Sequence, residues 1–177
     1  MKFLLTIFTI ISFSSLCAEE PIKIYLCARL SKAAKEWNNE VSKELPDYEL
    51  FRPQDFDIDP LPEIEKDWAA YQFDIKGMEN ADLLLALTPY GRDCAWEIGW
   101  FGGMNKPSII YSEVDGDWIR DAMVKGGISA VVTNNSTVFE KLSLDPATSS
   151  KCYFIESKKE LGAVIKNIFH SLTNRNN

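Results

Sequence analysis

A single glutamate, Glu97, stands in an apolar stretch of the chain, ADLLLALTPYGRDCAWEIGWFGGMNKPSIIY (81–111). Its neighbours on both sides are bulky and apolar, among them Trp96 and Trp100, so a fully solvated position is unfavourable here. A carboxylate that is kept ionised beside apolar walls can act as a nucleophile and form a covalent intermediate. The alternative is a surface glutamate that only complements the dipole of a helix.

The residues just before Glu97 decide where its helix begins. We expect Gly91, Arg92 and Asp93 to form a loop, Asp93 to cap a helix that starts near residue 94, and Glu97 to fall in the first turn. The positive end of the helix dipole would then lower the pKa of the Glu97 carboxyl group and keep it ionised.

Apolar runs typical of strands alternate with helical patterns along most of the chain. In SKAAKEWNNEVSKEL (31–45), apolar residues recur at helical spacing after a possible cap at Ser31. Strands that alternate with helices predict right-handed βαβ units. We therefore expect one doubly wound, flavodoxin-like α/β domain with about five parallel strands flanked by helices. The strand-like runs are 22–28, 48–53, 81–87, 106–112, 128–134 and a last short one at 151–157, and a helix is expected from about Glu63 to Asn80. The continuous apolar run in 82–87 fits a strand that is buried on both faces.

In such sheets, ligands bind beyond the carboxyl ends of the strands, where the strand order reverses. Tyr25, Cys27 and Arg29 lie at the end of the first predicted strand, and Glu97 follows the third. The first strand is not followed by GxGxxG, and the sequence has no GxxxxGK[ST]. Neither a dinucleotide-binding fingerprint nor a P-loop is therefore predicted.

The first residues, MKFLLTIFTIISFSSLCAEE, have the pattern of a secretory signal peptide, with Lys2, an apolar run and small residues up to Ala18. We predict a signal peptide at 1–18, a domain at 19–172 and a polar tail at 173–177. The protein is then exported, to the periplasm or the outside, and has no membrane anchor after processing. A lipoprotein with a lipidated Cys17 is the weaker alternative, because Leu16 is bulkier than the residue that usually precedes such a cysteine.

Charge and cysteine content exclude several function classes. Processing would leave 177 − 18 = 159 residues and remove Lys2, which moves the net charge from −7 to −8. An acidic domain without a basic stripe is a poor binder of nucleic acid. Cys27, Cys94 and Cys152 would remain, with no CxxC pair and only His170 as a histidine, so we predict no metal site. Two free thiols at Cys27 and Cys94 are expected over a disulfide between them.

Several motifs together resemble the nucleoside 2-deoxyribosyltransferases and the related 2'-deoxynucleoside 5'-monophosphate N-glycosidases. They are KIYLCARLS at the first strand, YQFDIKGMENADLLLAL across the following helix and strand, and AWEIGWFGGMNKPSIIY after it. VKGGISAVVTN resembles the last core strand of that family. The resemblance covers the chain from Ile22 to about Leu142.

The resemblance implies an enzyme that cleaves or transfers at the N-glycosidic bond of a (deoxy)nucleoside or nucleotide. Glu97 would attack the anomeric carbon and form a covalent glycosyl-enzyme, and Tyr25 would orient it. Asp74 would contact the nucleobase and manage the proton that the leaving nitrogen requires. Asp82 would fix the backbone at the start of the third strand. No metal or organic cofactor is implied, and the partner is a small nucleoside or nucleotide.

The loop before Glu97 departs from the family pattern. Transferases of the family commonly carry an aspartate six positions before the nucleophile, where this chain has Gly91, and the nearest carboxylate here is Asp93. We take Arg29, Cys27, Gly91 and Asp93 as candidate substrate contacts, with Arg29 able to meet a 5'-phosphate.

Two other functions stay open at this point. One is a binding module that holds a nucleotide or sugar-phosphate without catalysis, and the other is an exported N-glycosidase that acts on a dinucleotide such as NAD. The family builds active sites at subunit contacts, so a homo-oligomer is expected, with Trp96, Trp100 and Phe101 as candidate interface residues.

Overall fold

The fold was analysed in a computed structural model, which describes residues 20–116 and 120–174. The predicted signal peptide at 1–18 lies outside the described residues, as do the last three residues of the predicted tail. Within the described part, no helix has both the length and the apolar composition needed to cross a membrane.

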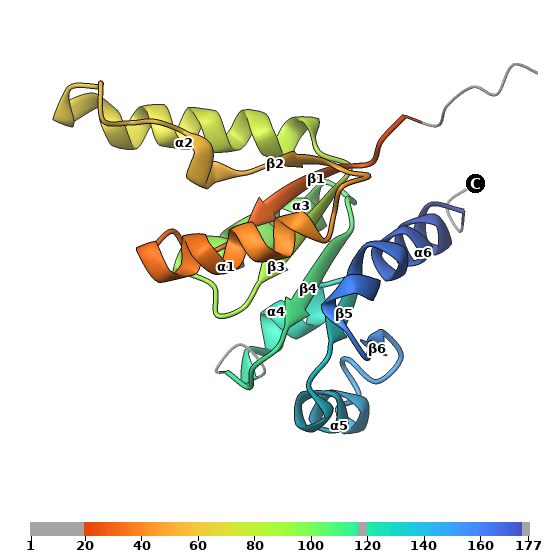
Figure 1. The fold of residues 1–177 in the computed structure, drawn as a ribbon. Helices are drawn as coiled ribbons and strands as arrows, with labels where there is room; N and C mark the ends of the chain where they lie inside the picture. Colours follow the sequence, from red (N-terminus) through yellow and green to blue (C-terminus); the bar gives the residue numbers. More distant parts are fainter. Residues whose placement is uncertain (1–19, 117–119, 175–177) are drawn as a thin grey trace, which may run out of the picture.

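Six parallel strands form one sheet, in the order β2-β1-β3-β4-β5-β6 (Figure 1). The flavodoxin-like α/β fold is thus confirmed, with one strand more than the expected five, because the short run at residues 152–154 pairs with β5 at the edge. The strands are β1 (Lys23–Cys27), β2 (Glu49–Phe51), β3 (Leu83–Leu87), β4 (Ser108–Ser112), β5 (Ala130–Thr133) and β6 (Cys152–Phe154).

Helices cover both faces of the sheet. Apolar residues of α1 and α6 pack on one face, and those of α2, α3, α4 and α5 pack on the other (Figure 1). Because both faces are covered, every residue of Leu83–Leu87 is buried, which explains the unbroken apolar run in the sequence. The helices are α1 (Lys32–Lys43), α2 (Glu63–Asn80), α3 (Arg92–Gly103), α4 (Ala122–Gly127), α5 (Ser136–Leu144) and α6 (Leu161–Thr173), with short 3-10 helices at Pro53–Asp55 and Lys158–Glu160.

Several local predictions are confirmed. The Ser31 side chain accepts a hydrogen bond from the Ala34 backbone N–H and caps α1, and α2 has the predicted bounds. Asp82 fixes the backbone as expected, because its Oδ2 accepts a hydrogen bond from the Lys23 N–H at 2.8 Å. This contact joins the starts of β1 and β3.

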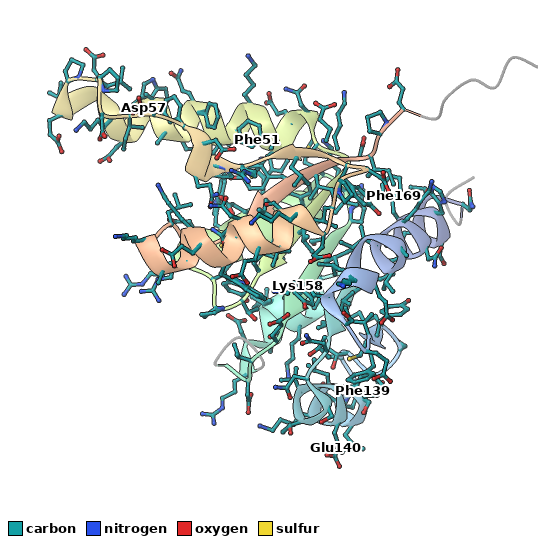
Figure 2. All side chains as sticks on the ribbon, viewed as in Figure 1. Phe51, Asp57, Phe139, Glu140, Lys158 and Phe169 are labelled. Atoms are coloured by element: carbon teal, nitrogen blue, oxygen red, sulfur yellow. The ribbon has the colours of Figure 1, made fainter. Side chains whose placement is uncertain are left out.

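An aromatic stack connects β1 to α2. The Phe51 ring lies 5.5 Å from the Tyr25 ring and 4.6 Å from the Phe73 ring, centroid to centroid. Phe51 lies where β2 meets α2 (Figure 2), and Gly77 is the residue of α2 that packs against it. A Cβ atom at Gly77 would overlap the Phe51 ring, so glycine permits the close approach of this helix to the sheet.

Lys106 also fixes the carboxyl end of α2, close to Gly77. Its Nζ donates hydrogen bonds to the carbonyl oxygens of Met78, Glu79 and Ala81, at 3.3, 2.6 and 2.8 Å. A cation at the carboxyl end of a helix satisfies carbonyls that have no partner within the helix and complements the dipole. The carboxyl-terminal part of α2 is therefore fixed both by packing on Phe51 and by hydrogen bonds to Lys106.

Candidate active site

The carboxyl ends of β1 and β3 meet at the point where the strand order of the sheet reverses. β1 and β3 are paired neighbours, and the chain continues from β1 into α1 on one face and from β3 into α3 on the other. This is where parallel α/β sheets bind ligands. A cavity of 480 Å³ opens here, which is within the usual size range for small-molecule sites.

Glu97 lines this cavity from α3, and only 8% of its surface is exposed. The Tyr25 hydroxyl, from the buried strand β1, donates a hydrogen bond to Glu97 Oε1 at 2.8 Å. The carboxylate and the phenol are 72 positions apart in the sequence. Strand pairing between β1 and β3 brings them together.

Two expectations about this helix were wrong. The helix begins at Arg92 with Gly91 as its N-cap, so Asp93 lies inside the first turn and its side chain does not cap. Glu97 is consequently the sixth residue of the helix and lies in the second turn, where the dipole has little effect.

The pKa of Glu97 is raised, not lowered as expected. Burial is the largest cause, while the Cys27 thiol and the Tyr25 hydroxyl lower the pKa in part by hydrogen bonding to the carboxylate. Tyr25 thus offsets some of the cost of keeping a charge in an apolar site. Burial and the adjacent Glu97 charge raise the pKa of Tyr25 itself, so it stays a hydrogen-bond donor.

Asp74 lines the same cavity from α2. Burial, with the charges of Glu97 and Asp93, raises its pKa from 3.8 to about 7. A carboxyl group with this pKa exchanges its proton near neutral pH and is suited to general acid and base catalysis. Two carboxyl groups with different environments therefore face one cavity.

The candidate substrate contacts fall into two groups. Arg29, Gly91 and Asp93 line the cavity, and among the described residues that line it Arg29 is the one cation. Cys27 is not among the lining residues and is 1% exposed, so the expected direct contact between Cys27 and a substrate does not fit the structure. It packs against Glu97 instead, because it is the last residue of β1 and its side chain turns to the α3 face.

The cavity has an apolar wall that the sequence did not identify as part of the site. Tyr71, Ile75 and Met78 lie three to four residues apart on α2, together with Asp74, and Trp96 joins them from α3. Their spacing around Asp74 is the signal that could have found them, since residues three and four apart share one face of a helix. Of the three expected interface residues, Trp96 is 53% exposed, whereas Phe101 is fully buried in the core, which excludes Phe101 from an interface.

Cys94 is a further residue of the site. It lines the cavity one helical turn before Glu97, and its Sγ, the Cys27 Sγ and a Glu97 carboxylate oxygen lie within 4.8 Å of one another. Cys27 and Cys94 are free thiols in the structure, in agreement with the sequence-based expectation. These three residues form the one group of potential metal ligands found in the described part of the chain.

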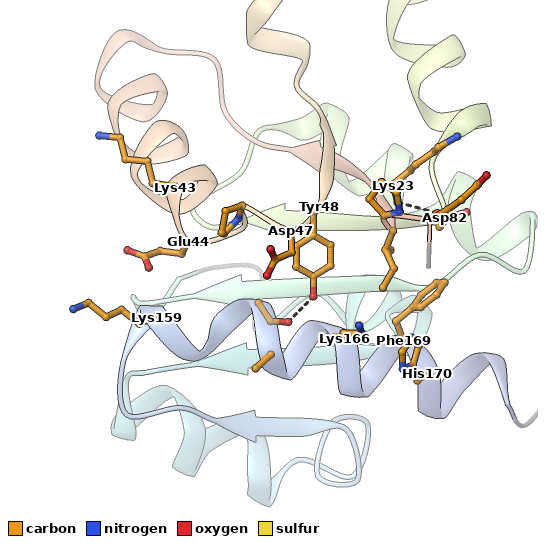
Figure 3. A pocket seen from close by; sticks show the side chains of 16 residues that line it. Lys23, Lys43, Glu44, Asp47, Tyr48, Asp82, Lys159, Lys166, Phe169 and His170 are labelled. Atoms are coloured by element: carbon orange, nitrogen blue, oxygen red, sulfur yellow. Dashed lines mark hydrogen bonds between the residues drawn. The ribbon is translucent and has the colours of Figure 1, made fainter. Parts of the chain in front are cut away.

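A larger cavity, of 960 Å³, lies at the opposite end of the sheet (Figure 3). Lysines and carboxylates are mixed along its walls, and its surroundings include structural contacts such as the Tyr48 hydroxyl, which donates to the Gly162 carbonyl at 2.5 Å. Asp82 borders this cavity and serves the backbone contact with Lys23 described above. Glu97 and Asp74 both line the smaller cavity, so the smaller cavity is the candidate active site.

Comparison with known proteins gives a family match over most of the domain. The model of the nucleoside 2-deoxyribosyltransferase family matches residues 24–145. No curated protein sequence matches the chain.

Solved structures give the following similarities. The 2-deoxyribosyltransferase of Bacillus psychrosaccharolyticus is 21% identical over 62% of this chain and 84% of its own, with a TM-score of 0.51. A conserved protein of Enterococcus faecalis V583 is 18% identical over 83% of this chain and 98% of its own, with a TM-score of 0.49. A CMP N-glycosidase of Clostridium botulinum is 18% identical over 70% of this chain and 98% of its own, with a TM-score of 0.44.

Proposed function

Because the chain belongs to the nucleoside 2-deoxyribosyltransferase family, we propose that it cleaves the N-glycosidic bond of a (deoxy)nucleoside or nucleotide, with Glu97 as the nucleophile. The observation that carries the proposal is the hydrogen bond from the Tyr25 hydroxyl to Glu97 Oε1, because Glu97 lines the same cavity as Asp74. The hydrogen bond orients the carboxylate at the cavity, where it can attack a bound substrate.

In the first step, a Glu97 oxygen attacks the anomeric carbon while the bond to the base nitrogen breaks. Asp74 gives its proton to the departing base, which leaves more easily as a neutral molecule. The products are a free base and a glycosyl ester of Glu97. The apolar wall of Tyr71, Ile75 and Met78 is suited to hold the planar base beside Asp74.

In the second step, water or a second base attacks the anomeric carbon from the opposite face. Asp74, now ionised, accepts the proton of the acceptor, and Glu97 leaves as a carboxylate. Two displacements at the same carbon retain its configuration. Water as the acceptor makes the protein a hydrolase, and a base makes it a transferase.

The test is release of free base from a panel of nucleosides and their 5'-monophosphates, with and without a second base. Glu97→Gln should lower the rate about a thousandfold or more, because the nucleophile is lost. Glu79→Gln, which removes an exposed carboxylate of α2, is the matched control and should keep full activity. Equal turnover by the wild type and Glu97→Gln would refute the role of Glu97.

We also propose that the protein is exported, on the basis of the signal-peptide pattern at 1–18. Mass spectrometry of the protein isolated from the producing cells should give an N-terminus near Glu19. An intact N-terminus at Met1 would contradict the proposal.

A further inference from the structure

Three buried side chains beside the cavity form a ligand set that the proposed reaction uses only in part. Cys27 Sγ, Cys94 Sγ and a Glu97 carboxylate oxygen lie within 4.8 Å of one another. Thiolates and carboxylates are common ligands of zinc in proteins. We propose that Cys27, Cys94 and Glu97 form a binding site for a soft divalent metal ion of the Zn²⁺ type.

The distances fit such an ion after a small contraction. With Zn–S bonds of about 2.3 Å and Zn–O bonds of about 2.1 Å, tetrahedral coordination places the ligand atoms roughly 3.6 to 3.8 Å apart. The three atoms therefore need to move inward by about 1 Å or less, which rotation of the side chains can supply.

The elements that carry the ligands are fixed in the core. Cys27 ends the buried strand β1, and Cys94 and Glu97 lie three residues apart on one face of α3. Tyr25 donates to Glu97 Oε1, so the metal ion would take Oε2. Cys94 and Glu97 line the cavity, and a fourth position on that side can take a water molecule. Three protein ligands with one open position are a usual arrangement for zinc.

Binding of the ion displaces one proton from each thiol, so two protons are released for each ion bound. A disulfide between the same cysteines would need an oxidant to accept two electrons. A divalent cation compensates for the cost of burying two thiolates.

A metal ion in this site would occupy the oxygen with which Glu97 attacks. Zn²⁺ should then inhibit N-glycosidic cleavage in competition with the substrate, a consequence that rests on the proposed function. The binding of the ion does not rest on it, because binding can be measured without any substrate.

The test uses Co²⁺, which reports thiolate ligands through a charge-transfer band in the near ultraviolet. The full chain with Cys17→Ser and Cys152→Ser keeps Cys27 and Cys94 as its cysteines. We expect titration of this reduced protein with Co²⁺ to saturate at one ion and to give the intense visible bands of a tetrahedral site. Added Zn²⁺ should remove these bands.

Variants assign the ligands. Cys27→Ser and Cys94→Ser should each weaken Co²⁺ binding about tenfold or more, and Glu97→Gln should do so while leaving both thiols in place. Circular dichroism of each variant shows whether it is folded. Absence of a charge-transfer band in the folded starting protein, or an unchanged band after both cysteine substitutions, would overturn the proposal. Either result would leave the base-release assay of the proposed function unaffected.

Discussion

Substitution of Tyr25 by phenylalanine tests how the buried carboxylate is kept active. The change removes the hydroxyl that donates to Glu97 Oε1 at 2.8 Å and keeps the ring in its stack with Phe51. A hydrogen bond to a charged group contributes about 1.5–3 kcal/mol. Because it favours the ionised carboxylate, its loss should lower kcat/KM for base release about 10- to 150-fold at neutral pH.

The pH profile separates this explanation from a general loss of structure. Tyr25 lowers the pKa of Glu97, so in Tyr25→Phe the pKa should rise, and the acidic limb of log(kcat/KM) against pH should move to higher pH. Activity should partly recover at alkaline pH, as far as the protonation of Asp74 allows.

Tyr111→Phe is the matched control, because Tyr111 is also a fully buried strand tyrosine that donates to a glutamate, Glu113, on the other face of the sheet. It should change kcat/KM by about twofold or less. An acidic limb that stays in place in Tyr25→Phe, whatever the change in rate, would refute the reasoning.

Three further predictions concern α2. Asp74→Asn should lower kcat for base release about 10²- to 10⁴-fold. Since the pKa of Asp74 is about 7, wild-type activity should decline above about pH 7, and the variant should lose this decline. A wild-type profile that is flat from neutral to alkaline pH would contradict this. Because that pKa is raised above 3.8, Asp74 stabilises the fold at acidic pH and loses this contribution as the pH rises from about 4 to about 7. In thermal melts, the Tm of the wild type relative to that of Asp74→Asn should therefore fall over this pH range. Gly77→Ala should lower the free energy of unfolding by about 1–3 kcal/mol in denaturant titrations, because the new methyl group overlaps the Phe51 ring, which Tyr25 and Phe73 hold. Gly103→Ala of α3, whose Cβ would meet nothing within 4 Å, is its control and should be neutral or stabilising.

Much of the fold follows from local sequence patterns. The apolar run Leu83–Leu87 predicted a strand buried on both faces, and α2 has the predicted bounds because its start and end are marked by Pro62 and by the following strand. The last short run was identified at 151–157, but about five strands were expected in the sheet, because a strand of three residues that is mostly exposed has little burial to mark it as part of the sheet. Its place in the sheet depends on pairing with β5, which is a tertiary contact.

The candidate site could be predicted only in part. Glu97 was identified as a candidate nucleophile because it is a single glutamate among bulky apolar residues. The family resemblance added Tyr25 and Asp74. The predicted direction of the shift in the Glu97 pKa was wrong for two reasons. The helix starts two residues earlier than expected, which takes Glu97 out of the first turn. Burial raises the pKa, and burial depends on packing between α3 and β1.

The proximity of Cys27 to Cys94 also depends on tertiary packing. A disulfide between the two was an open alternative, but no metal site was predicted, because the chain has no CxxC pair and one histidine. The two cysteines are 67 positions apart and meet because β1 pairs with β3. Because Cys27 ends a strand and Cys94 and Glu97 lie on α3, no local spacing pattern joins all three residues in the sequence.

The central claim is that Glu97 forms a covalent bond to the sugar. The most direct measurement is mass spectrometry of protein quenched during turnover of a deoxynucleoside, followed by fragmentation of the peptide that contains Glu97. We expect a deoxyribosyl ester on Glu97 in the wild type and none in Glu97→Gln. Turnover with the sugar attached to another residue, or undiminished turnover by Glu97→Gln, would contradict it.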